Sequence, residues 1–100
     1  MTEPAIASVL DAVARDSRLS GFLREGRIEA MPAKRSRRLL LLEEVAQAFE
    51  PGVRYPESEV NRLLGAMFSD HAALRRYLVD EELLARADGQ YWRSGGPVRS

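Results

Sequence analysis

Apolar side chains in the first fifteen residues recur at the spacing of an amphipathic helix. They fall at i, i+3, i+4 and i+7, and they are Ile6, Val9, Leu10 and Val13. This spacing places all four on one stripe of a helix. Pro4 suits the first turn, where an amide would have no intrahelical partner. The pattern predicts a helix from about Pro4 to Arg15.

Residues 16–30 carry weaker signals. Between 16 and 26, serines and glycines are mixed with three large apolar side chains, which favours a short helical turn between breaks. Residues 27–30 then alternate polar and apolar side chains ahead of Pro32. This alternation predicts a short edge strand with Ile28 and Ala30 facing inward.

Three further helices are predicted between residues 33 and 81. A heavily apolar helix spans residues 33–49 and ends at Pro51-Gly52, and a second spans residues 56–68. Ser69-Asp70 then supplies an N-cap for a third, from residue 71 to about 81. Because about two residues separate the last two helices, they must cross steeply, as in a helix-turn-helix.

Asp88-Gly89 predicts a β-hairpin between residues 83–87 and 90–93, because two-residue hairpin turns need positive φ at both central positions. In this register Arg86 faces Tyr91 and shares a sheet face with Arg93, while Ala85 pairs with Trp92 on the other face.

The order of these elements defines a fold class that is mainly α with a small β-sheet. After an extra N-terminal helix, the predicted order is a strand, three helices and a hairpin. This order matches a winged helix-turn-helix in which the hairpin is the wing. We expect an N-terminal helix and connector at residues 1–25, a winged-helix-like domain at 26–93, and a flexible tail at 94–100.

The composition of the chain limits the kinds of site that it can form. One hundred residues suffice for one hydrophobic core. The chain has no cysteine and a single histidine, His71, so we expect neither a metal nor a cofactor. The N-terminus lacks the pattern of a signal peptide, and the longest aliphatic run is far too short to span a bilayer, so a cytoplasmic protein without a membrane partner is predicted.

Charge is balanced overall but segregated along the chain. Fifteen basic and fifteen acidic residues cancel. Residues 24–38 hold six basic and two acidic side chains, a net of +4, whereas residues 43–62 hold five acidic and two basic, a net of −3. From residue 83 onward, three arginines and one aspartate give +2. Only local clustering can therefore attract a polyanion.

Four groups of residues resemble the uncharacterised prokaryotic domain-of-unknown-function family 2087. They are Ile28-x-x-x-Pro32-Ala33-Lys34-Arg35, Tyr55-x-Glu57-x-Glu59-Val60-Asn61-x-x-Leu64, Asp70 with Leu74-Arg75-Arg76-x-Leu78-Val79-Asp80, and Gly89-x-Tyr91-Trp92-Arg93. The resemblance spans residues 26–93. It implies a bacterial winged-helix-like domain, found alone or in transcriptional regulators, and suggests nucleic-acid binding without supplying catalytic residues. Pro56 departs from the family, which usually has Thr or Ser there.

The first candidate binding group is a basic turn at the start of the central helix, made of Lys34, Arg35, Arg37 and Arg38. Free backbone amides and the positive end of the helix dipole also favour an anion at this position. The alternative is a solvated turn that pairs with Glu29 or with Glu43 and Glu44.

The second candidate group is Arg75 and Arg76, midway along the predicted recognition helix. Arginine is shaped for bidentate contact with guanine or phosphate. The alternative is structural, because Arg76 lies four residues from Asp80, the spacing of an intrahelical ion pair. Asp80, Glu81 and Glu82 would also repel a duplex at that end of the helix.

The third candidate group is the hairpin face of Arg86, Tyr91 and Arg93, which would straddle a nucleic-acid backbone if it is exposed. The alternative is that Trp92 anchors the hairpin to the core and the opposite face is only solvated.

These observations favour a small DNA-binding, transcription-regulatory module. The alternative function is a protein-interaction or dimerisation module on the same scaffold, with a protein partner or a second copy bound. An enzyme is not expected, because His71 has no nucleophile placed by a recognisable motif, and Glu57 and Glu59 already suit a helix N-terminus.

Overall fold

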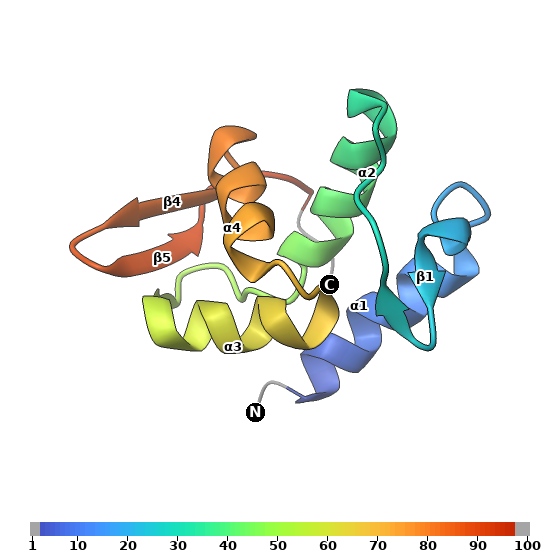
Figure 1. Ribbon diagram of the computed structural model, residues 1–100. Coiled ribbons are helices and arrows are strands. Elements are labelled where there is room, and N and C mark those ends of the chain that lie inside the picture. The colour runs from blue at the N-terminus through green and yellow to red at the C-terminus, as the bar shows by residue number, and fades with distance from the viewer. Residues whose placement is uncertain (1–2, 98–100) are drawn as a thin grey trace.

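The computed structural model describes residues 3–97 as four α-helices with short antiparallel strands. The elements are α1 (Glu3–Arg15), a 3₁₀ turn η1 (Ser20–Phe22), β1 (Leu23–Arg24), β2 (Arg27–Ile28), α2 (Arg35–Ala46), β3 (Arg54–Pro56), α3 (Glu57–Met67), α4 (His71–Asp80), β4 (Leu84–Ala87) and β5 (Gln90–Arg93). The predicted class, mainly α with a small β-sheet, is confirmed. Figure 1 shows the β4–β5 hairpin and α1 at opposite sides of the helices.

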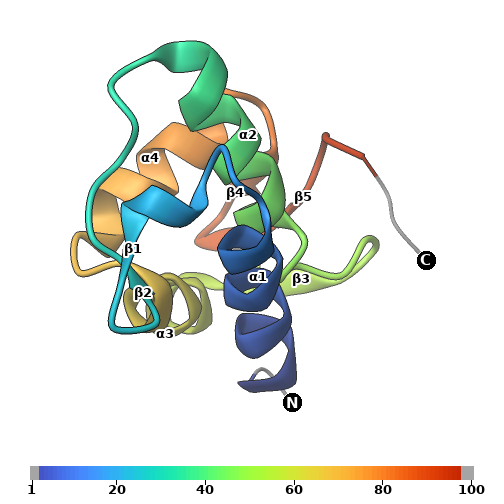
Figure 2. The same ribbon diagram turned by 90° about the vertical axis from the view of Figure 1, so that its right-hand side faces the viewer.

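The N-terminal helix forms as its apolar stripe predicts. Val9 and Val13 are buried, while Ile6 and Leu10 pack against the core from its margin. Figure 2 shows α1 lying against α2, on the side of the molecule away from the hairpin. The helix therefore belongs to the single hydrophobic core that α2, α3 and α4 share.

The segment after α1 folds back on itself. Leu23 pairs with Ile28 and Arg24 with Arg27, around a turn in which Glu25 and Gly26 both have positive φ. Ile28 is buried as expected, but the strand ends there and Ala30 is exposed. The prediction of an inward Ala30 is wrong because the alternation stops two residues earlier than the pattern indicated.

The three core helices lie close to their predicted bounds. Leu41, Leu42 and Val45 of α2 are fully buried. Residues 68–70 join α3 to α4, which cross steeply (Figure 1). The predicted N-cap is confirmed, since Asp70 Oδ1 accepts a 3.1 Å hydrogen bond from the amide of Ala73.

A three-stranded sheet with the order β3-β5-β4 stands beside α3 and α4. The predicted hairpin register is confirmed, with Arg86 opposite Tyr91, and Asp88 and Gly89 have φ of 53° and 74°. The third strand is β3, whose Tyr55 pairs with Tyr91. The strand predicted at residues 27–30 corresponds to β2, which pairs with β1 in a separate two-stranded sheet.

The inner and outer faces of this sheet are the reverse of those considered from the sequence. Tyr91, only 1% exposed, lies in the core with Leu84. Trp92 is half-buried on the outer face, where the Arg54 guanidinium stacks 4.1 Å from its ring centroid. Tyr91 is on the inner face because α3 and α4 cover that side of the sheet.

Residues 94–97, the start of the predicted flexible tail, are held against the core. Ser94 donates its amide to Leu83 O at 3.0 Å and its hydroxyl to Glu82 O at 2.8 Å. Gln47 donates to Pro97 O at 2.8 Å. The last three residues of the predicted tail, 98–100, lie outside the described residues. No helix within residues 3–97 has the length and apolar character needed to cross a membrane.

Candidate nucleic-acid interface

A groove of about 270 Å³ lies between α4 and the β4–β5 hairpin. It is lined by Ala72, Arg75, Arg76, Val79, Asp80, Arg86 and Tyr91. Leu74 and Leu78 turn the opposite side of α4 into the core, which leaves this side of the helix open. Three arginines and one aspartate make the lining cationic.

Arg76 and Arg86 are exposed at this groove, one from the helix and one from the hairpin. Within residues 3–97, neither side chain has an ion pair or hydrogen bond. The intrahelical pair between Arg76 and Asp80, considered from their spacing, does not form. Both guanidinium groups are therefore available to a ligand.

Arg75 lies deeper, half-buried between α4 and α3. Its Nη1 donates to Asn61 Oδ1 across the two helices. Its Cζ lies 6.0 Å from the ring centroid of Tyr91. The side chain is thus fixed at one end by α3 and flanked by the hairpin.

Tyr91 and Arg93 belong to the fold rather than to an exposed hairpin face. The Tyr91 hydroxyl donates to Glu57 Oε1 at 2.9 Å. Arg93 donates to the carbonyls of Ala46 and Phe49, both at 3.1 Å, where α2 ends. The expectation that these two residues share an exposed face with Arg86 is wrong, because that side of β5 packs on the helices.

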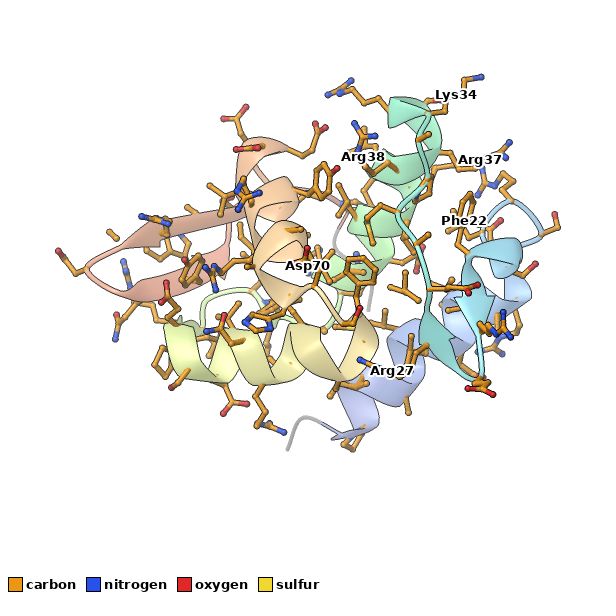
Figure 3. The ribbon with its side chains drawn as sticks, in the orientation of Figure 1. Phe22, Arg27, Lys34, Arg37, Arg38 and Asp70 are labelled. Atoms are coloured by element: carbon orange, nitrogen blue, oxygen red, sulfur yellow. The ribbon has the colours of Figure 1, made fainter. Side chains whose placement is uncertain are left out.

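The basic turn at the start of α2, where Figure 3 labels Lys34, Arg37 and Arg38, has both bound and unbound side chains. Arg35 forms a bidentate pair with Glu81, at 2.6 and 3.0 Å, and so ties α2 to the end of α4. The guanidinium of Arg38 donates to two carbonyls of the preceding loop and stacks 5.0 Å from the ring centroid of Tyr77. The side chains of Lys34 and Arg37 are exposed and make no hydrogen bond or ion pair in the described part of the chain.

The acidic partners of this turn differ from those considered. Glu29 pairs instead with Arg24, at 3.5 Å. Glu81 was considered only as a repulsive charge at the end of α4, yet it neutralises Arg35. This ion pair neutralises one of the three acidic side chains at the end of α4, so the net negative charge there is smaller than the sequence indicated.

Sequence reasoning missed Asn61 as a partner of Arg75. The two residues are fourteen positions apart, and only the crossing of α3 over α4 brings them together. The sequence offered a single signal, a polar side chain directly after the buried Val60 of α3. Among residues 3–97, no three His, Cys, Asp or Glu side chains form a cluster that could hold a metal ion.

The fold and the groove together define a small, mainly helical domain with an arginine-lined cleft between a helix and a β-hairpin. The chain belongs to DUF2087, a family described as uncharacterized protein conserved in bacteria, whose family model matches residues 27–93. The resemblance found in the sequence motifs is thereby confirmed. No curated protein and no solved structure matches the chain.

Proposed function

We propose that the chain is a DNA-binding module of the winged helix-turn-helix type that serves transcription regulation in the cytoplasm. The proposal is supported by the order of the elements along the chain, which is helix α2, strand β3, helices α3 and α4, and then the β4–β5 hairpin. In such a module the second helix of the crossed pair enters the major groove and the hairpin lies beside it. Here α4 takes the position of the recognition helix and β4–β5 that of the wing.

The dimensions of α4 suit this role. A helix with its side chains is about 10–12 Å wide, and the major groove of B-DNA is about 12 Å wide. The open side of α4 carries the small residue Ala72 beside its arginines. A duplex can therefore approach this side of the helix closely.

The observation that carries the proposal is the position of Arg76 and Arg86. They reach one groove from two different elements, and neither has an acidic partner within residues 3–97. Phosphates spaced along a nucleic-acid strand supply negative charge to both at once. Lys34 and Arg37 are two more unpaired cations at the start of α2; Figure 3 shows Lys34 at the free end of that helix and Arg37 on its side away from the hairpin.

The test is a fluorescence-anisotropy titration of a random-sequence DNA duplex at several salt concentrations. Each phosphate contact contributes about −0.9 to the slope of log K against log salt. The double variant Arg76→Ala, Arg86→Ala should therefore flatten the slope by about 1.8. At 0.1 M salt the same counterion release corresponds to a loss of affinity of roughly 10- to 100-fold.

The matched control is Arg15→Ala, Arg24→Ala, which removes the same total charge. Both side chains are largely exposed, at 75% and 72%, and lie in α1 and β1, across the molecule from the hairpin (Figure 1). This control should keep the wild-type slope and affinity to within about two-fold. Equal effects of the two double variants would contradict binding at the groove.

The second candidate function is a protein-interaction or dimerisation module on the same scaffold. It is favoured by the formal net charge of zero and by Asp80 within the groove lining. A largely apolar protein interface responds weakly to salt, whereas phosphate binding weakens log-linearly. A dimer seen by light scattering, together with no duplex binding at low salt, would favour this candidate.

A further inference from the structure

Arg75 is held in one orientation by its surroundings. Nη1 is fixed by Asn61 of α3, and the guanidinium lies beside the ring of Tyr91. That ring is itself buried and is held by the hydrogen bond of its hydroxyl to Glu57. Three elements, α3, α4 and β5, therefore fix this side chain before any ligand binds.

The other edge of the same guanidinium is open. Nε and Nη2 of Arg75 have no acceptor among residues 3–97, and the side chain lines the groove. Arg35 shows the contrasting case, because its Nε and Nη2 are both occupied by the two oxygens of Glu81. Arg75 thus offers the pair of parallel N–H groups that Arg35 uses for a carboxylate.

Two parallel donors on a fixed side chain match two adjacent acceptors on a rigid ligand. Guanine presents O6 and N7 side by side in the major groove, and arginine is their commonest specific partner. Phosphate contacts position a protein but carry no sequence information, and the exposed, unpartnered Arg76 and Arg86 are available for them. Base reading depends on a preorganised donor geometry, which the contact with Asn61 provides.

We infer that Arg75 is a specificity-determining residue that recognises a guanine through Nε and Nη2, and that Asn61 is its positioning residue. This inference rests on the proposed DNA-binding function. It predicts that base preference and overall affinity are governed by different arginines in the same groove. Losing one bidentate base contact lowers discrimination against the other bases by roughly 5- to 150-fold.

The experiment selects bound duplexes from a pool with a randomised central region and compares the enriched sequences among variants. Wild type should enrich one position for guanine. Arg75→Lys keeps the cation but cannot form the fork, so it should lose the preference at that position and keep most of its affinity for the unselected pool. Arg76→Ala, Arg86→Ala should bind more weakly and enrich the same sequence.

Asn61 is tested with two variants of similar size. Asn61→Leu removes the acceptor and should weaken the guanine preference. Asn61→Asp keeps an acceptor for Arg75 and should retain the preference. A merely structural role would change thermal stability without changing the enriched base. Thermal melts of every variant, each expected within a few degrees of wild type, separate the two effects.

Four outcomes overturn the inference in distinguishable ways. An unchanged preference in Arg75→Lys removes Arg75 as the reading residue. An unchanged preference in Asn61→Leu removes the positioning role alone. Wild type that binds duplexes without enriching any base refutes base reading and leaves the DNA-binding function standing. Wild type that binds no duplex at low salt refutes both.

Discussion

Replacing Arg93 tests whether this arginine serves the fold rather than a ligand. Its guanidinium donates to Ala46 O and Phe49 O at the end of α2, and to Gly95 O and Pro97 O in the segment that follows β5. Ala46 O also accepts the amide of Phe49 at 3.0 Å, so there the guanidinium adds a second hydrogen bond. Phe49 O lies in the turn after α2 and accepts from Arg93, as a carbonyl beyond a helix end needs a donor from elsewhere. Arg93→Met keeps most of the apolar stem and removes every hydrogen bond that the guanidinium donates.

The magnitude follows from the hydrogen bonds to Ala46 O and Phe49 O. A hydrogen bond with a charged partner contributes about 1.5–3 kcal/mol, and this side chain is half-buried. The bonds to Gly95 and Pro97 add less, because they also order a terminal segment. We expect Arg93→Met to lower the free energy of unfolding by about 3 kcal/mol, which for a domain of this size lowers Tm by roughly 12–24 °C.

Urea denaturation followed by far-ultraviolet circular dichroism measures this loss. The control is Arg86→Met, which removes the same charge from the neighbouring strand at an exposed site with no hydrogen bond or ion pair among residues 3–97. Such a change should stay within about 0.5 kcal/mol of wild type. Equal stability of the two variants would refute the assignment of Arg93 to the fold.

Two other changes test local packing and charge. A Cβ on Gly95 would lie 2.5 Å from the backbone oxygen of Glu82, so Gly95→Ala should destabilise the protein by about 1–3 kcal/mol in a thermal melt. The control is Gly21→Ala, whose added Cβ would have nothing within 4 Å, and it should melt near the wild-type temperature. Hydrogen bonds from the Arg18 side chain and amide lower the pKa of Asp16 from 3.8 to about 2. Because the folded pKa is the lower one, the resulting stability is present above pH 4 and is lost as the pH falls toward 2. The stability difference between wild type and Asp16→Asn should therefore disappear over that window, and a difference independent of pH would contradict the pairing.

The helices could be predicted from the sequence because each carries a complete local signal. Periodic apolar side chains define α1, α2 and α3, and the capping side chain of Asp70 marks the start of α4. The β4–β5 turn is similarly local, since Asp88-Gly89 supplies both positive φ angles. In each case the deciding interactions lie within a few residues.

The third strand and the orientation of the sheet could not be predicted in this way. β3 is three residues long and ends in Pro56, too short for an alternating pattern, and its existence depends on pairing with β5 some 35 residues later. Alternation along β5 shows that Tyr91 and Trp92 face opposite sides, but it does not show which side meets the helices. Long-range packing decides both features.

Several arginines among residues 3–97 have one of two roles that their sequence positions do not reveal. Some satisfy the backbone or a carboxylate: Arg27 donates to Gly65 O and Ala66 O at the end of α3, and Arg35 binds Glu81. Arg75, Arg76 and Arg86 instead gather around one groove in which Asp80 is the single acidic residue. Like charges held together repel one another and do not stabilise the folded state. Asp80 is the only acidic side chain in the groove lining, so the anionic ligand proposed to bind across α4 and the hairpin would supply the missing negative charge.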